Sequence, residues 1–203
     1  MKTAFRTALL SVLLCAPAAF AQDAAQPAGE MSAEAEAMMA AWEKAMTPGE
    51  QHARLAEHFA GTWNTTMKLW MEPGAEPMVS TGTSTNTMIL GGRQLKMEFS
   101  GTFMDMPFMG IGFTGYDNVR GVYTGTWTDN MTTGIMFSTG SYDAPTATYT
   151  FNSEMADPVQ AGLMVPVRET IKVVDVDHHV MEMFETRDGV ENRTMILEYS
   201  RKM

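Results

Sequence analysis

The most unusual chemistry in this sequence lies in its methionines. The chain has 21 Met but a single Cys among 203 residues. Three of them, Met104, Met106 and Met109, fall in one short run. Thioether sulfurs are soft ligands that select Cu(I), so this run is a candidate copper site. Met is also an adaptable apolar filler of irregular cores, and its spread over the whole chain favours that interpretation. Cu(I) binding is kept as the alternative.

Four charged residues are candidates for contact with a ligand: Arg93, Asp117, Asp129 and Arg168. A charged group enclosed by a fold must be paired or must face a ligand. Asp117 follows Gly115 and Tyr116 and precedes Asn118, where a strand is expected to end. Asp and Asn side chains often bond the backbone of such turns without any further function. A structural role in a turn is therefore favoured for Asp117.

The sequence offers no recognisable catalytic or zinc-binding motif. His178 and His179 are adjacent, so on a strand they point to opposite faces. His52 and His58 are six residues apart and lie on different faces of a helix. No Gly-x-Ser-x-Gly sequence is present. We therefore expect no enzymatic activity and no cofactor, although haem binding through one exposed His stays open.

The first 21 residues have the three parts of a secretory signal peptide. Lys2 and Arg6 precede an apolar run, and Ala19-Phe20-Ala21 predicts cleavage after Ala21. Without Lys2 and Arg6 the chain keeps 12 basic residues against 24 acidic ones, a net charge of −12. This charge repels nucleic acid and anionic lipid surfaces, and no later segment is apolar enough to insert into a membrane. We expect a periplasmic or secreted protein.

Composition and periodicity divide the rest of the chain into three parts. Residues 22–30 are rich in Ala, Gln, Pro and Gly and predict a flexible linker. Residues 31–60 predict a helical segment. One helix, over 32–46, carries an apolar face of Met38, Met39, Trp42 and Met46 that must pack on the domain or on a partner. A second helix is expected to begin with a capping box at Thr47.

From residue 61 the apolar period changes to two, and turn residues recur every 10 to 15 positions. Residues 61–203 therefore predict ten antiparallel strands. We place them at 61–71, 78–90, 92–103, 108–117, 121–129, 133–142, 146–155, 165–175, 178–187 and 191–201. Closure into an up-and-down β-barrel would protect the edge strands. A barrel of about ten strands has room for an internal cavity.

Two sets of residues carry a resemblance to known families. Gly61-Thr62-Trp63 opens the first strand and Arg201 lies in the last one, which resembles the calycin arrangement in which Arg covers the Trp at the closed end of a barrel. The second set is the His52 to Trp63 lead-in, Gly91-Gly92-Arg93, the run from Met106 to Gly110 with Gly112, Gly115 to Asn118, Tyr123 with Trp127 and Asp129, Arg168, and Tyr199 to Arg201. Over residues 48–203 this set is similar to the bacterial domain-of-unknown-function 1579 family. The resemblance implies a secreted, lipocalin-like barrel and no particular chemistry.

These observations favour a protein that binds a small hydrophobic or amphipathic molecule inside the barrel. Apolar side chains would remove the ligand from water, and a few polar groups would orient its head group. The candidate ligand-binding residues are Arg93, Tyr116, Trp127, Arg168, Met67, Met97 and Phe99. Trp63 and Arg201 are expected to close the barrel. One further alternative is a filled barrel that binds a protein partner through its N-terminal helix.

Overall fold

The computed structural model describes residues 31–203. The predicted signal peptide and the predicted linker lie outside the described residues. Helix α1 (Ala33–Met46) and helix α2 (Glu50–Phe59) precede ten strands. No helix of the described part is both long and apolar enough to cross a lipid bilayer.

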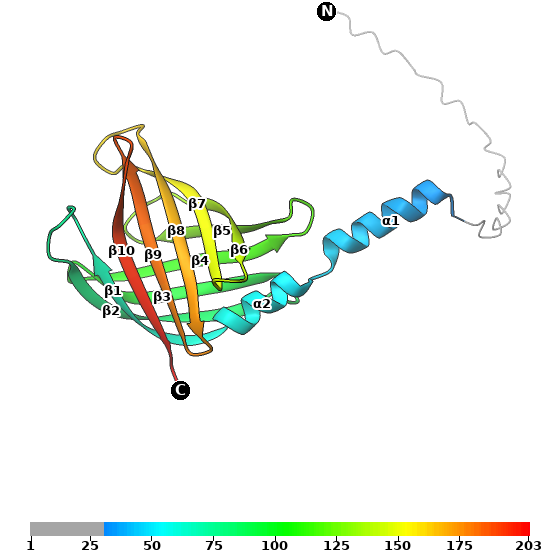
Figure 1. Cartoon of the computed structure of the whole chain (residues 1–203), viewed down its shortest axis with the longest axis horizontal. Helices are drawn as coiled ribbons and strands as arrows, with labels where there is room; N and C mark the ends of the chain where they lie inside the picture. Colours follow the sequence, from blue (N-terminus) through cyan, green and yellow to red (C-terminus); the bar gives the residue numbers. More distant parts are fainter. Residues whose placement is uncertain (1–30) are drawn as a thin grey trace, which may run out of the picture. The chain divides into compact units, whose positions relative to one another are not determined.

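The ten strands form one closed antiparallel barrel, as the sequence predicts. They are β1 (Gly61–Leu69), β2 (Met78–Ile89), β3 (Gln94–Phe103), β4 (Met106–Asp117), β5 (Val122–Asp129), β6 (Met136–Asp143), β7 (Thr148–Ala156), β8 (Met164–Asp175), β9 (His178–Arg187) and β10 (Val190–Arg201). Each strand pairs with its sequence neighbour, and β1 pairs with β10 to complete the ring. No open strand edge is left in the barrel (Figure 1).

Tight turns set the register of the strands, because several of their residues adopt positive φ. Gly91 and Gly92, with φ of 63° and 84°, reverse the chain between β2 and β3. Asp188 and Gly189 do the same between β9 and β10, with φ of 53° and 77°. Glycine, and to a lesser degree Asp, tolerates this left-handed conformation. These turns connect strands that are neighbours in the barrel.

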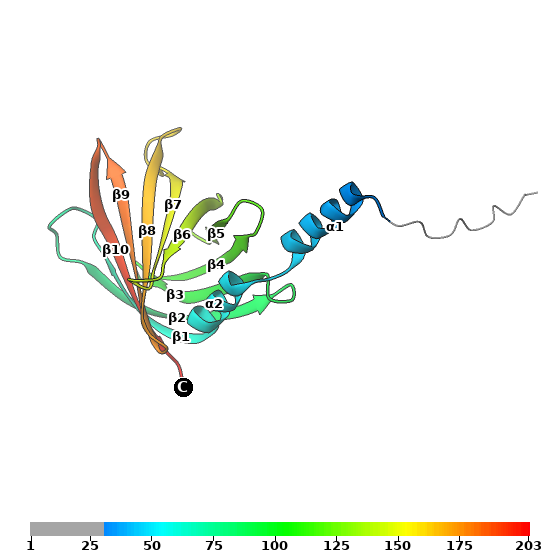
Figure 2. The ribbon, with the colours of Figure 1, turned by 45° about the vertical axis from the view of Figure 1, so that its right-hand side comes forward.

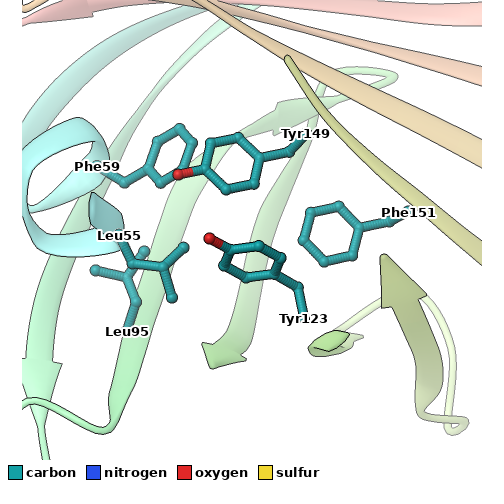
Figure 3. Close-up of a cluster of buried hydrophobic side chains, with 6 residues drawn as sticks. All are labelled: Leu55, Phe59, Leu95, Tyr123, Tyr149 and Phe151. Atoms are coloured by element: carbon teal, nitrogen blue, oxygen red, sulfur yellow. The ribbon is translucent and has the colours of Figure 1, made fainter. Parts of the chain in front are cut away.

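Helix α2 lies at one end of the strands and fills that end of the barrel (Figures 1 and 2). Its apolar stripe contributes Leu55 and Phe59, which are 0% and 6% exposed. Figure 3 shows these two side chains directed toward Tyr123 and Tyr149 from the strands. The complete cluster of buried residues is Leu55, Phe59, Leu95, Tyr123, Tyr149 and Phe151. The hydrophobic core is therefore built at the α2 end.

The start of α2 differs from the predicted capping box. The helix begins at Glu50 with Gly49 as the N-cap, two residues later than Thr47 would give. The backbone N–H of Gly49 donates to Nδ1 of His52 at 3.1 Å. His52 is 4% exposed, and burial lowers its pKa, which favours the neutral ring that this acceptor role requires. The side chain of His52 therefore accepts the N–H of the N-cap residue, which is the role that the predicted capping box assigns to Glu50.

Candidate functional site

The closed end of the barrel is organised around Trp63, the first buried residue of β1. Its indole N–H donates to the carbonyl of Phe59 at 2.9 Å. The guanidinium of Arg201 lies 4.1 Å from the centre of the Trp63 ring, and its Nη1 donates to the carbonyl of Ala60 at 2.8 Å. This is the Trp–Arg arrangement that the sequence predicts. It ties the end of α2 to the first and last strands.

A second group of polar contacts fixes α2 to the opposite wall. Nδ1 of His58 lies 3.0 Å from the hydroxyl of Tyr149. Arg54 donates to the hydroxyl of Tyr123 at 3.4 Å and stacks over the ring of Tyr142 at 4.6 Å. Burial raises the pKa of Tyr123 and Tyr149, so both hydroxyls stay protonated. This end of the barrel is a packed closure held by α2 and is not the open part of the interior.

The other half of the interior is lined by apolar side chains that stay partly exposed. Alternation along each strand places Met67 on the same face as buried Trp63, and Met97 and Phe99 on the face of buried Leu95. By the same rule Trp127 shares the inward face of Tyr123 on β5. Met67, Met97, Phe99 and Trp127 are half-buried although they point inward. Solvent therefore reaches this part of the interior, which we call the lumen.

Glycines on the barrel wall let two of the lumen aromatics lie against it. A Cβ built on Gly110 would stand 2.2 Å from the Trp127 ring, and one on Gly112 would stand 2.8 Å from the methyl carbon of Met97. A Cβ on Gly82 would approach the Phe99 ring to 2.8 Å. Any side chain at these positions would push an aromatic ring or a Met away from the wall. The glycines thus allow these side chains to lie close to the barrel wall.

The carboxylate of Glu169 points into this apolar lumen from β8. It lies on the face of buried Val165 and Val167, and its cross-strand neighbours are Phe151 and Met183. Burial raises its pKa from 4.5 to about 7, and no hydrogen bond or positive charge in the described part of the chain opposes this shift. Glu169 is therefore an inward-facing acid without a partner.

Two further inward-facing polar groups lack a partner among residues 31–203. These are the hydroxyl of Thr65 and Nδ1 of His179, and each residue is 3% exposed. Both flank Tyr199, because Thr65 pairs with it from β1 and His179 pairs with it from β9. The rings of His179 and Tyr199 stack with centroids 4.1 Å apart. Burial, together with the charge of Arg201, lowers the pKa of His179 to about 3, so this ring is neutral.

The predicted ligand-binding residues do not all gather in one place. Met67, Met97, Phe99 and Trp127 face the lumen, as described above. Arg168 instead lies on the outer face of β8, where it pairs with Glu191 at 2.6 Å and stacks on Phe184 at 4.1 Å. Tyr116 lies at the α2 end, with its ring centroid 6.1 Å from that of His52. Neither Arg168 nor Tyr116 contributes to the lumen.

Arg93 and Asn118 hold the chain segment between the two helices. Arg93 is exposed in the turn after Gly92, and its Nη2 donates to the carbonyl of Met46 at 2.6 Å. The Asn118 amide donates to the carbonyls of Lys44 and Thr47 at 2.9 and 2.7 Å. Arg93 therefore faces away from the lumen, contrary to the proposed head-group contact. Its role is to satisfy a free carbonyl at the end of α1.

The two aspartates that follow strands are turn residues, as favoured for Asp117 on sequence grounds. Oδ1 of Asp117 accepts the backbone N–H groups of Val119 and Arg120. Oδ1 of Asp129 likewise accepts two backbone N–H groups, and its Oδ2 accepts the indole N–H of Trp127 at 3.0 Å. Asp129 thus also fixes the orientation of one ring that lines the lumen.

The methionine run does not form a thioether cluster. Met104 and Asp105 are the turn between β3 and β4, with φ of 50° and 61°. Met106 and Met109 are three residues apart on β4, so they point to opposite faces of the sheet. All three Met side chains are about half exposed. The fold therefore does not direct these sulfurs toward one common ion.

Sequence reasoning missed Glu169, Thr65, His179 and Tyr199 as site residues. A signal for Glu169 is present in the sequence. Alternate positions of β8 are Val165, Val167, Glu169, Ile171 and Val173, so one acid interrupts an apolar series of period two. The opposite face of the strand also holds apolar residues, which hides the pattern until the burial of Val165 and Val167 defines the inner face.

The raised pKa of Glu169 predicts a pH-dependent cost to stability. A carboxyl group whose pKa is higher in the folded protein stabilises it below about pH 4.5, and this contribution is lost as the pH rises to about 7. We expect Glu169→Gln to raise the free energy of unfolding by about 2 kcal/mol near pH 8 and by nothing near pH 4. Urea denaturation at both pH values measures this. Glu154→Gln, on the exposed face of β7, is the matched control and should change neither value.

A search of solved structures found the crystal structure of Rv2717c from M. tuberculosis, with a TM-score of 0.58 and 11% identity over 77% of this chain and 100% of that one. A redesigned β-barrel and the protein EF1p2_mFAP2b bound to DFHBI both have a TM-score of 0.39, with 14% and 13% identity. They cover 74% of this chain and 96% and 99% of their own.

The likeness to Rv2717c, at this low identity, concerns the fold alone. No curated protein matches the sequence. A family model does match, over residues 47–201, and its description is a protein of unknown function (DUF1579). The match begins just before α2 and ends at Arg201, so it spans the α2 closure together with the whole barrel. The chain therefore belongs to the DUF1579 family.

Proposed function

We propose that this protein binds a small hydrophobic or amphipathic molecule in the lumen, and that it acts as a carrier and not as an enzyme. The observation that carries the proposal is the exposure of inward-facing apolar side chains in the half of the barrel that α2 does not fill. Met67, Met97, Phe99 and Trp127 are half-buried where a filled barrel would bury them. A bound molecule would cover this surface, and each Å² of apolar area removed from water contributes about 25 cal/mol.

The predicted signal peptide supports a site of action outside the cytoplasm. We propose that the protein acts in the periplasm or after secretion, where a carrier would meet molecules of low water solubility. The described part of the chain contains no group of His, Cys, Asp or Glu residues arranged to hold a metal ion. The ligand that we propose is an organic molecule.

A variant that fills the lumen tests this proposal. Ser153 is half-buried on the inner face of β7, between Phe151 and Met155, and its cross-strand partners are Ser138 and Val167. We expect Ser153→Trp to weaken binding of the uncharged fluorophore N-phenylnaphthylamine by about tenfold or more, because the indole occupies the ligand's space. Fluorescence titration measures the affinity.

The matched control is Asn152→Trp, which adds the same side chain one residue away on the outer face of the same strand. This variant should bind the fluorophore as the unmodified protein does. Equal affinity in both variants would place the binding site outside the lumen. Absence of fluorophore binding by the unmodified protein would argue for a filled barrel.

Helix α1 favours a second candidate function, which is binding of a protein partner. Its residues Met38, Met39, Trp42 and Met46 are 57%, 54%, 62% and 55% exposed. No residue of α1 is buried. Large apolar side chains gathered on one exposed face are typical of interaction sites. This role would use residues other than those of the lumen, so both functions can exist in one protein.

A further inference from the structure

Glu169 narrows the class of molecule that the lumen would hold, and this inference rests on the proposed function. An ionised carboxylate in an apolar enclosure is costly unless a positive charge or hydrogen-bond donors accompany it. Glu169 has neither among the described residues. Its neighbours on the same strand face are Val167 and Ile171, and across the sheet they are Phe151 and Met183. The lumen therefore holds the Glu169 carboxylate without a positively charged partner from the described residues.

The hydroxyl of Tyr199 favours the same kind of counterpart. Burial raises the pKa of the Tyr199 hydroxyl, and the Glu169 carboxylate adds to this shift. Tyr199 pairs across the sheet with Thr65, whose hydroxyl lacks a partner among the described residues. The Thr65 hydroxyl also approaches Phe99 of the lumen, since a Cβ on Gly82 would be 3.1 Å from that oxygen and 2.8 Å from the Phe99 ring. A hydroxyl oxygen and a carboxylate both accept hydrogen bonds.

We propose that the lumen binds an amphipathic organic cation, a protonated amine with an apolar chain, whose ammonium group pairs with Glu169 while its chain lies against the Met and aromatic side chains. An ammonium group brings the missing positive charge and up to three donors. The ring of Phe151, the cross-strand neighbour of Glu169, and the ring of Tyr199 provide aromatic surface that attracts cations.

Other ligand classes fit this site less well. A metal ion needs several oxygen ligands, and Glu169 is a lone carboxylate in the apolar part of the lumen. The next inward acid, Glu185, already pairs with Arg187 at 3.0 Å. A fatty acid would bring a second negative charge to Glu169. The net charge of the chain, −10, also attracts cations and repels anions.

Three probes with the same chain length and different head groups test the inference: octylamine, octanol and octanoate. Each is titrated against the bound fluorophore N-phenylnaphthylamine near pH 8, with the full-length mature protein. We expect octylamine to displace the fluorophore at a concentration about tenfold lower than octanol, and octanoate to be the weakest. In Glu169→Gln the advantage of octylamine over octanol should disappear. The concentration of octanol that displaces the fluorophore should stay the same. Glu154→Gln should behave as the unmodified protein does.

A titration in the unmodified protein checks the same pairing without a substitution. Tyr199 could also titrate near Glu169, but burial raises its pKa, so its hydroxyl stays protonated between about pH 5 and pH 8. The inward acid two residues along β9 from Met183, Glu185, is paired with Arg187. The affinity for octylamine should therefore rise with pH over this range as Glu169 ionises. Carboxyl-carbon NMR should also show that octylamine lowers the pKa of Glu169.

The outcomes separate this inference from the proposed function. If the fluorophore binds but octylamine has no advantage over octanol, or if the advantage persists in Glu169→Gln, the cation inference is wrong and lumen binding stands. A lower affinity of octylamine at higher pH would likewise overturn it. If neither the fluorophore nor any of the three probes binds, the proposed function fails and the inference fails with it.

Discussion

Replacing Trp63 by alanine is expected to lower the free energy of unfolding by about 4 kcal/mol. The side chain is 0% exposed and is among the largest fully buried groups in the described chain. Its removal leaves a cavity and frees the carbonyl of Phe59, which the indole N–H now satisfies. It also leaves the Arg201 guanidinium without the ring beneath it. Urea denaturation near neutral pH measures the loss.

The matched control for Trp63 is Trp42→Ala. Trp42 lies on α1 and is 62% exposed, so its loss should change the unfolding free energy by less than about 0.5 kcal/mol. If Trp63→Ala is too unstable to purify, Trp63→Phe keeps a ring and removes the N–H, and a loss of about 2 kcal/mol is expected. Equal stability of Trp63→Ala and the unmodified protein would show that this closure does not hold the barrel.

Replacing Leu55 by alanine is expected to cost about 3 kcal/mol. Leu55 is 0% exposed. From α2 it packs against the strands, in one cluster with Leu95, Tyr123 and Tyr149 (Figure 3). Three carbon atoms are removed from a site whose walls are closed by strands, so the cavity cannot collapse easily. Urea denaturation again gives the free energy. This change tests whether α2 is part of the core.

The control for Leu55 makes the same substitution at a position with little packing. Leu163 precedes β8 and is 41% exposed, and its contact with Asp157 uses backbone atoms. Leu163→Ala should therefore cost less than about 1 kcal/mol. Similar losses in the two variants would mean that α2 adds no more to the core than an ordinary surface segment does.

The sequence by itself determined the architecture of this barrel. Strand periodicity depends on alternate residues facing one apolar interior, and turn residues depend on local backbone sterics, so both can be detected in short segments. The pattern therefore placed all ten strands, with β9 at its observed bounds of His178–Arg187. It also singled out Trp63 and Arg201, which contact each other from opposite ends of the barrel chain.

Local signals also explain where sequence reasoning went wrong. Arg93 and Arg168 are candidate contacts for a ligand head group because charged residues next to apolar strands suggest side chains that the barrel encloses. The structure gives them outer positions, one on the carbonyl of Met46 and the other on Glu191. The Met104-Asp105 turn adopts positive φ without a glycine, so a methionine run that suggested a metal site is in part a turn. A residue type alone does not tell which face of a sheet it occupies.

Only the tertiary structure decided where the barrel is filled and where it is not. Burial of Leu55 and Phe59 against β3, β5 and β7 is a contact between segments far apart in the chain, so no local pattern contains it. The same holds for Glu169, whose lack of a partner depends on what β1, β9 and β10 bring near it. The cost of an unpaired charge is set by its surroundings in space. The sequence thus determined the barrel, and the packing of α2 into one end of it left the lumen at the other.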